Sequence, residues 1–249
     1  MKSIKILLFL LFGVSLNSCF FAVNFGDKNG NGNLKTEERY VNQNFAKIIG
    51  SGGLEIYLTE GSENKIIVEA DENLLEIIET TISDGILKVQ TKKNIISSEA
   101  KRVLITFKNL SVVKANSGTT IIGKSIIRNK ILTLESSSGA NIDMEVFTKE
   151  LFTKTSSGAN INIKGKATIL YAKTSSGSEL NAKDLNTINS NIKAHSGSKI
   201  MVTTQNKLEA TASSGGNIQY YGNPNAVIKD ADSSGSIKKT NSFSSKWKK

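Results

Sequence analysis

Apolar and polar residues alternate along the C-terminal half of the chain, in short stretches that recur around a Ser-Gly pair. Over residues 132–136 and 151–155, every second side chain is suited to face a core, which is the period of a β-strand. Two positions repeat most strictly, and we expect both to be buried. They hold Leu132, Leu151, Leu170, Leu208 and Ile228 seven residues before the glycine, and Ile121, Ile142, Ile161, Leu180, Ile200 and Ile218 three residues after it.

The Ser-Gly pair itself recurs every 18 to 21 residues. The residue after the glycine is small in every unit, and the next residue is polar in most units. Each unit therefore predicts a strand, a tight corner and a second strand, because glycine adopts the positive φ that a sharp corner often needs. The glycines are Gly118, Gly139, Gly158, Gly177, Gly197, Gly215 and Gly235.

This self-similarity is typical of proteins built from stacked repeats. A unit of about 19 residues at about 3.3 Å each gives a path of roughly 60 Å, which suits one coil of a β-solenoid. An antiparallel sandwich or barrel also has short strands at regular spacing, but the position-by-position identity of the units favours the solenoid. The sequence thus predicts an all-β fold with a β-solenoid over residues 116–237.

Residues 40–115 have a less regular β pattern. Gly-Ser-Gly-Gly at 50–53 is similar to a repeat corner, and Asp84-Gly85 between two strand-like stretches predicts a two-residue hairpin turn. Apolar residues over 71–78 are grouped as on a short helix, with Asp71 as its N-cap. We expect this part to cap one end of the stack, as solenoids require for solubility.

The first residues have the pattern of an export signal. A basic start and an apolar run over 6–16, too short to span a bilayer, precede the single cysteine, Cys19. The stretch resembles a bacterial lipobox, so residues 1–18 are predicted to be a lipoprotein signal peptide and Cys19 to carry a lipid anchor. The alternative is an ordinary signal peptide with an unrelated cysteine. Residues 19–39, polar and rich in Asn and Gly, are predicted to be a flexible tether.

Composition narrows the classes of function. The formal charge of +10 favours anionic partners such as acidic polysaccharide or lipid headgroups. Nucleic acid is not expected for an exported, anchored chain with few aromatic residues and no recognisable binding module. His195 is the single histidine and aligns with corner serines of other units. With one histidine and no usable cysteine, the chain has no thiolate or histidine-pair metal site, and we expect no cofactor.

An enzyme acting on polysaccharides is the weaker alternative, since some of these enzymes are β-helices. Such enzymes gather their charged catalytic groups on one face, whereas the acids here fall at different repeat positions, and the corner serines are too alike for one to stand out as a nucleophile. The units also differ from the glycine/aspartate nonapeptide that binds calcium. The scattered acids are Asp143, Glu145, Glu179, Asp184, Asp230 and Asp232.

One repeat position carries charge. Four residues before the glycine, three consecutive units have Lys154, Lys173 and Lys193, preceded by Lys114 and Glu135. In a stack, the three lysines would lie about 5 Å apart and repel one another unless they are solvated or paired with anions. They are a candidate contact line for an anionic glycan. The alternative is a solvated face that resists edge aggregation.

The order of these motifs resembles a known family. The stretch SGGLEIYLTEGSENKIIVEADENLLEIIET at 51–80 and the SSGANI repeats, after a lipoprotein-like start, are similar to the "putative auto-transporter adhesins" with the head GIN domain, which are common among Bacteroidetes. The resemblance covers residues 40–237. It implies a right-handed β-helical fold on the cell envelope, and it brings no catalytic residues.

The sequence therefore predicts an exported, lipid-anchored β-solenoid of the cell envelope, in the outer membrane, that works by adhesion or ligand display without catalysis. The main alternative is a periplasm-facing structural lipoprotein that binds envelope components. No acidic cluster follows Cys19, so either face of the membrane is compatible with the sequence. Residues 238–249, with five lysines, Phe243 and Trp247, are predicted to be a basic cap or tail.

Overall fold

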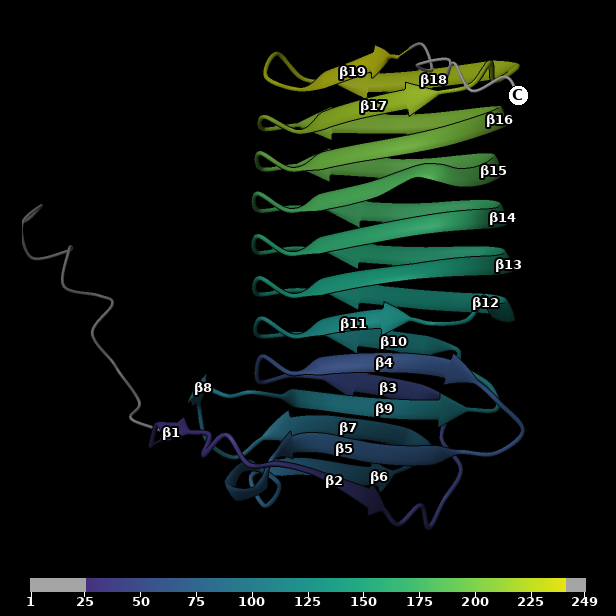
Figure 1. Ribbon diagram of the computed structural model, residues 1–249. Coiled ribbons are helices and arrows are strands. Elements are labelled where there is room, and N and C mark those ends of the chain that lie inside the picture. Colours follow the sequence, from purple (N-terminus) through teal and green to yellow (C-terminus); the bar gives the residue numbers. More distant parts are fainter. Residues whose placement is uncertain (1–25, 241–249) are drawn as a thin grey trace, which may run out of the picture.

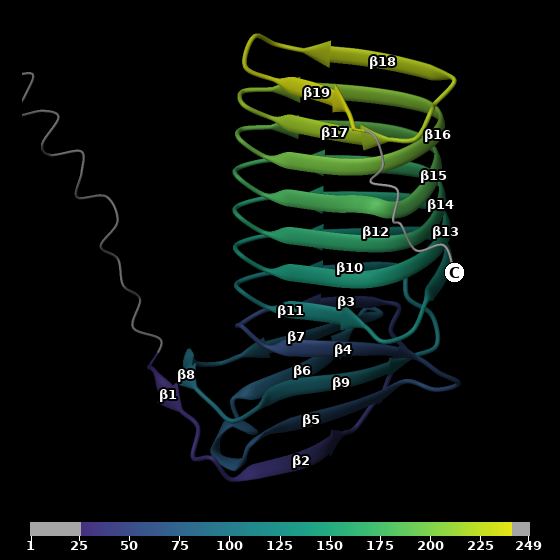
Figure 2. The ribbon, with the colours of Figure 1, turned by 45° about the horizontal axis from the view of Figure 1, so that its top comes forward.

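The computed structural model describes residues 26–240, which form an all-β molecule. Seventeen strands belong to one sheet that winds into a stack of coils, so the predicted β-solenoid is confirmed (Figure 1; Figure 2). A separate pair of short parallel strands, β1 (Lys28–Asn29) and β8 (Ile95–Ser97), lies beside the lower end of the stack in Figure 1. Within the described residues, no helix has the length and apolar character needed to cross a membrane.

The regular part of the stack is made of strands that pair in parallel with equivalent strands of neighbouring coils. A long strand leaves one Ser-Gly corner, bends midway and returns to the next corner. The register joins equivalent repeat positions, so that Leu132 pairs with Leu151 and Leu151 with Leu170. The strands are β10 (Val112–Ala115), β11 (Thr120–Gly123), β12 (Ile127–Ser136), β13 (Asn141–Thr155), β14 (Asn160–Thr174), β15 (Glu179–His195), β16 (Lys199–Ser213) and β17 (Asn217–Tyr221).

Six of the seven Ser-Gly corners use two consecutive residues with positive φ, and Ser234-Gly235 is the exception. In six corners the serine has φ between 50° and 55° and the glycine between 67° and 79°. This pair reverses the chain as in a type I′ turn, and glycine takes the conformation without the steric cost that serine bears. The glycine N–H of one coil donates to the serine carbonyl of the next, for example Gly139 to Ser157 at 3.0 Å. A ladder of backbone amides therefore joins the corners.

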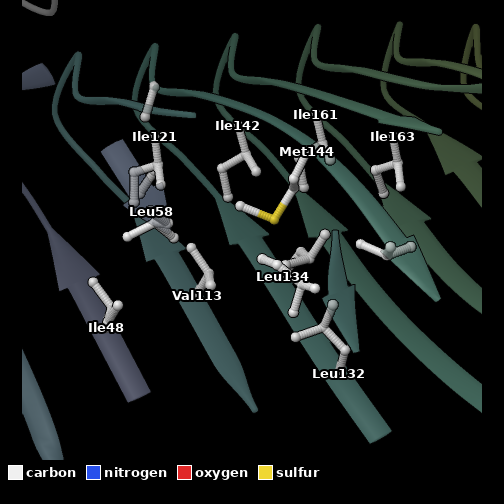
Figure 3. Packing of buried hydrophobic residues seen from close by; sticks show 14 of the residues in the cluster. Ile48, Leu58, Val113, Ile121, Leu132, Leu134, Ile142, Met144, Ile161 and Ile163 are labelled. Atoms are coloured by element: carbon white, nitrogen blue, oxygen red, sulfur yellow. The ribbon is translucent and has the colours of Figure 1, made fainter. Parts of the chain in front are cut away.

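The interior is a column of apolar side chains that runs along the stack. Figure 3 shows Ile121, Ile142 and Ile161 of successive coils pointing into the space that Leu132 and Leu134 fill from the other side. All five are at most 1% exposed. Burying one such side chain contributes about 2 kcal/mol. Because the side chains of one coil pack against those of the next, each coil is stabilised mainly by the coils on either side of it.

The N-terminal half continues the same stack, but not in chain order. β3 (Lys47–Gly50) and β4 (Glu55–Glu60) form a coil whose corner matches the repeat, since Gly53 N–H donates to the Ser117 carbonyl at 2.9 Å. This coil lies between β10–β11 and the coil of β7 (Ile86–Thr91) and β9 (Lys101–Phe107), which comes later in the chain. The stack therefore extends beyond the predicted 116–237.

Antiparallel strands close this end of the stack. β5 (Lys65–Asp71) pairs with β9 and with β2 (Leu34–Arg39), and β6 (Ile78–Ser83) pairs with β7. The β6–β7 turn is the predicted Asp84-Gly85 hairpin, with φ of 53° and 72°. Because β2 is paired here, the prediction of a flexible tether over 19–39 is wrong for residues 34–39. The predicted signal peptide and Cys19 lie outside the described residues.

Asp71 has a different role from the predicted N-cap. Only Glu72–Leu74 form a short 3-10 helix, η2, and the Asp71 side chain does not cap it. Its buried carboxylate instead accepts hydrogen bonds from the N–H groups of Gly32 (2.9 Å), Glu99 (3.0 Å) and Ala100 (3.1 Å). Burial alone would raise the pKa of Asp71, but these hydrogen bonds hold it below its ordinary value.

The other end of the stack is open among the described residues. β18 (Ala226–Ala231) pairs with β16, and β19 (Ser236–Lys239) pairs with β17. Leu208 is in register with Val227, so Ile228 points outward and is 55% exposed. The prediction that Ile228 is buried is wrong, because the last unit has one extra residue between its strand and its glycine. Most of the predicted basic tail, residues 241–249, lies outside the described residues.

Candidate functional site

The three lysines of the predicted contact line stand side by side on the outer face of the strand segments that precede the corners. Lys154 is in register with Lys173, and Lys173 with Lys193, and all three are exposed. We call these three residues the lysine stripe. Parallel strands lie about 4.8 Å apart, so three positive charges lie within roughly 10 Å of one another. Among the described residues, none of the three has a carboxylate within 4.0 Å.

Other lysines of the stack have acidic partners. In the same column, one coil before the lysine stripe, Glu135 pairs with Lys114 at 3.0 Å. On the strand segments that follow the corners, Lys199 of β16 lies 3.4 Å from Glu179 of β15 in the neighbouring coil. These pairs relieve the repulsion that stacking imposes on like charges. The lysine stripe is therefore set apart by having three lysines in register on adjacent strands, with no ion pair among the described residues.

Two aromatic side chains lie next to the lysine stripe on the same face. Phe152 and Tyr171 stand two residues before Lys154 and Lys173, and their rings stack with centroids 4.8 Å apart and planes 13° apart. Phe152 is 36% and Tyr171 37% exposed. A shallow depression of about 230 Å³ is lined by the two rings, the lysine stripe, Glu135 and Asn191, among others.

This aromatic pair was missed in the sequence. Phe152 and Tyr171 occupy the same repeat position, six residues before the glycine, while the neighbouring units have Thr133 and Asn191 there. A column with two adjacent aromatic residues and polar residues on both sides was the signal that could have revealed it. Strand alternation directs this position outward, so the rings are available to a ligand instead of the core.

The arrangement is suited to binding a flat, anionic molecule. An exposed pair of stacked rings offers an apolar surface, on which the C–H face of a sugar ring can pack. The ammonium groups of the lysine stripe lie beside that surface and can attract carboxylate or sulfate groups of the same molecule. The spacing of charges along the stack follows the strand spacing, so a chain-like ligand with repeated negative charges would meet several lysines at once.

Several of the scattered acids make contacts within the fold. Asp143 accepts a hydrogen bond from Asn162 at 3.1 Å, and Glu145 lies 3.5 Å from Lys164 of the next coil. Asp232 accepts hydrogen bonds from the N–H groups of Ser214 (2.9 Å) and Gly235 (2.7 Å) at the last corner. The Ser214 bond is the largest cause that lowers the pKa of Asp232. Asp143, Glu145 and Asp232 thus link one repeat to the next.

His195 lies where the repeat alignment puts it, at an exposed corner. It is in register with Ser213 of the next coil, and its backbone N–H donates to Ser198 Oγ at 3.1 Å. Within residues 26–240, no group of three or more histidine, cysteine or acidic side chains is arranged to hold a metal ion.

Comparisons with known proteins agree with this fold. Residues 44–224 match the model of a family described as "Putative auto-transporter adhesin, head GIN domain". No curated protein matches the chain. Neither this description nor those of the three solved structures reported next names a catalytic activity.

Solved structures from Bacteroides and Parabacteroides share the architecture. A "putative adhesin" from Bacteroides fragilis superposes with a TM-score of 0.80 at 17% identity, over 86% of this chain and 100% of its own. A "putative lipid binding protein" from Parabacteroides distasonis gives 0.73 at 19% identity, over 86% and 100%. A "putative adhesin" from Parabacteroides merdae gives 0.69 at 21% identity, over 86% and 99%. At these identities the likeness shows the fold alone.

Proposed function

The chain belongs to the family described as "Putative auto-transporter adhesin, head GIN domain", and from this premise we propose that it is a non-catalytic binding module of the cell envelope whose lysine stripe and adjoining aromatic pair hold an acidic glycan. The family description and the adhesin neighbours support an exported, adhesin-like role. The observation that carries the ligand class is the exposed Phe152–Tyr171 stack beside three unpaired lysines.

The physical reason is that the lysine stripe and the aromatic pair are both energetically unfavourable when no ligand is bound. Three stacked ammonium groups repel one another, and a bound polyanion would replace this repulsion by attraction. The rings expose apolar surface that a sugar face would remove from water. A neutral glycan would satisfy only the rings, and a small anion only the lysines. An acidic polysaccharide chain satisfies both.

The proposal includes a lipid anchor at Cys19. The apolar run over 6–16 followed by a lone cysteine supports it, and the first described strand, β1, lies beside the closed lower end of the stack. Anchoring there would hold the solenoid by one end and leave its faces accessible. Replacing Cys19→Ser should release the protein from membranes and abolish labelling by an alkyne-tagged palmitate. Retained labelling would show that the lipid is elsewhere.

The glycan proposal is tested with a matched pair of polymers. Purified protein lacking residues 1–19 is titrated with polygalacturonate, which carries a carboxylate on every sugar, and with its methyl ester, which has the same backbone without the charge. We expect binding of the acid form only. A triple variant with Lys154→Ser, Lys173→Ser and Lys193→Ser should bind about tenfold more weakly or worse.

The control variant loses the same number of positive charges, but from another part of the molecule. Lys88→Ser, Lys108→Ser and Lys47→Ser remove three exposed lysines from the capped half of the stack, and this variant should bind like the wild type. Equal loss in both triple variants would contradict the proposal, because binding would then follow net charge rather than the face.

The location is tested on intact cells. Protease added outside should digest this protein while a periplasmic control survives, which would agree with display to the outside. Digestion only after the outer membrane is permeabilised would rule out adhesion to other cells, and would favour the periplasm-facing structural lipoprotein that binds envelope components.

A further inference from the structure

A second basic surface lies at the edge of the stack opposite the Ser-Gly corners, where the long strands bend (Figure 1). There Arg128, Phe147 and Lys166 of three successive coils are in register and point outward. A hollow of about 900 Å³ lies over this bend and spans strands β12 to β16. We call it the bend hollow. The charged and the exposed apolar residues of its lining are Arg128, Lys130, Phe147, Lys149, Lys166 and Ile188.

The bend places side chains differently from a straight strand. In β13, Phe147 and Lys149 face outward around the inward Thr148, which is 7% exposed, and the half-buried Glu150 that follows then breaks the alternation. Thr148 Oγ1 lies 3.1 Å from the Lys130 carbonyl and 3.0 Å from the Glu150 carbonyl, to which it can donate. The threonine thus satisfies backbone groups at the bend and fixes its shape. Two outward rows of side chains then form the walls of the bend hollow.

The charge of the bend hollow is of one sign. Its described lining has four cationic side chains and no carboxylate. A smaller neighbouring hollow of about 620 Å³ shares Arg128 and Lys166 but also contains Glu145 and Asp184. Acidic residues are therefore present on this edge and are kept out of the larger hollow. Within the described residues, Lys130, Lys149 and Lys166 have no ion pair.

Arg128 distinguishes this hollow from the lysine stripe. The chain has three arginines, and two of them are held in ion pairs, Arg39 with Glu37 at 2.9 Å and Arg102 with Glu69 at 3.0 Å. Arg128 has a looser contact of 3.7 Å with Glu60 and donates to the Ile126 carbonyl at 3.4 Å, and its side chain is 57% exposed. A guanidinium presents a planar fork of N–H donors that suits phosphate oxygens. Lysines around it add point charges for the same group.

The rest of the lining suits a sugar. Phe147 is 57% and Ile188 45% exposed, which gives the hollow an apolar wall. Asn129, Thr168, Asn186 and Gln205 line it with amide and hydroxyl groups that can bind sugar hydroxyls. We infer that the bend hollow is a second binding site, which takes a phosphate-bearing saccharide. The phosphate lies among Arg128, Lys149 and Lys166, and the sugar packs against Phe147. This site is separate from the lysine stripe and does not depend on the proposed function.

The test uses phosphomannan and, as its uncharged match, mannan. Wild-type protein should bind phosphomannan and not mannan. The double variant Lys149→Glu and Lys166→Glu should bind phosphomannan at least about tenfold more weakly, because each reversal replaces an attraction by a repulsion. Lys149→Gln with Lys166→Gln serves as a milder version, and circular dichroism confirms the fold of both. Phe147→Ser should weaken binding without any change in charge.

Two controls separate this site from charge in general. Lys88→Glu with Lys108→Glu makes the same change in net charge in the capped half and should leave phosphomannan binding unchanged. The triple variant of the lysine stripe should also retain it, whatever happens to polygalacturonate. Phosphomannan binding by the Lys149/Lys166 variants at the wild-type level would overturn the inference, as would equal loss in the Lys88/Lys108 control.

The source of the saccharide phosphate is decided by competition. Glucose phosphate and phosphatidylinositol phosphate in phosphatidylcholine vesicles present the same chemistry in soluble and in lipid form. Competition by glucose phosphate alone supports a soluble or polymeric ligand, and stronger competition by the vesicles supports a lipid headgroup. Failure of both to compete with phosphomannan would overturn the inference.

Discussion

The lysine stripe and the bend hollow are two basic surfaces built from the same coils by different means. The lysine stripe lies on a flat part of the sheet, where one repeat position recurs in register and places like side chains side by side. The bend hollow lies where the strand changes direction, and its four cations come from two repeat positions, Arg128 and Lys166 from one and Lys130 and Lys149 from the other. Repetition thus gives a row of identical charges, whereas the bend gives a concave site with varied side chains.

The largest effect is expected from breaking the bend itself. Gly165 precedes Lys166 and has φ of +113°, and an added Cβ would meet the Val146 carbonyl oxygen at 2.1 Å. Gly165→Ala should therefore cost about 3 kcal/mol of unfolding free energy and disturb the bend hollow. Gly158→Ala, at a corner with φ of +68° and no atom within 4 Å of the added Cβ, should cost only about 1 kcal/mol.

Urea unfolding of the two glycine variants measures this difference. Equal stability of the two would show that the bend is no more constrained than a corner. The bend hollow would then not depend on a special backbone conformation, and the contrast with the lysine stripe would be lost.

The next effect concerns the lysine stripe alone. Loss of its three lysines should weaken polygalacturonate binding by about 2 kcal/mol, at roughly 0.5–1 kcal/mol for each exposed charge, and leave phosphomannan binding intact. Titration of both polymers against the same protein preparation measures this. Parallel loss of both ligands would mean that the two surfaces act as one.

A smaller effect should follow when the aromatic pair is removed without a change in charge. Phe152→Ser with Tyr171→Ser should lower polygalacturonate affinity by about 1 kcal/mol, since it removes the packing surface and leaves the lysine stripe. Phe147→Ser, the equivalent loss of an exposed ring at the bend, is the matched control and should leave polygalacturonate binding unaffected. Unchanged affinity in the Phe152/Tyr171 variant would show that the rings do not contribute and that polygalacturonate is bound by the lysines alone.

The smallest expected effect is a gain in stability. Lys173→Glu removes two like-charge contacts in the lysine stripe and puts a carboxylate between Lys154 and Lys193, so the melting temperature should rise slightly at low salt and less at high salt. Lys88→Glu provides the comparison for a lysine outside the lysine stripe. A lower melting temperature for Lys173→Glu at low salt would show that the three lysines do not repel one another.

The same contrast explains what the sequence could reveal. The solenoid and the stacking of Lys154, Lys173 and Lys193 were predicted correctly, because a fixed offset from each glycine keeps the register from coil to coil. Ile228 was assigned to the core wrongly, since one extra residue before the last corner shifts the offset. Counting from the glycine is reliable only near the corner.

The parts that were missed have no repeat signature. The lining of the bend hollow falls at the positions 9 to 11 residues before the glycine, but the residue types there differ from unit to unit, so no repeated position stands out. The coil of β7 and β9 follows that of β3 and β4 in the chain but lies on its other side, away from β10 and β11. No local pattern in the sequence shows this change in stacking order. Pairing of β2 with β5 depends on residues about 30 positions apart in a polar stretch, and that stretch was therefore interpreted as a tether.

The central claim is that the exposed face beside Phe152 and Tyr171 holds an acidic glycan. A crystal structure of the protein with a short oligogalacturonate tests it most directly, because it shows where the ligand lies. We expect a sugar ring stacked on the Phe152–Tyr171 pair, with carboxylates within about 3 Å of the ammonium groups of the lysine stripe. An oligogalacturonate bound elsewhere, with this face empty, would contradict the account.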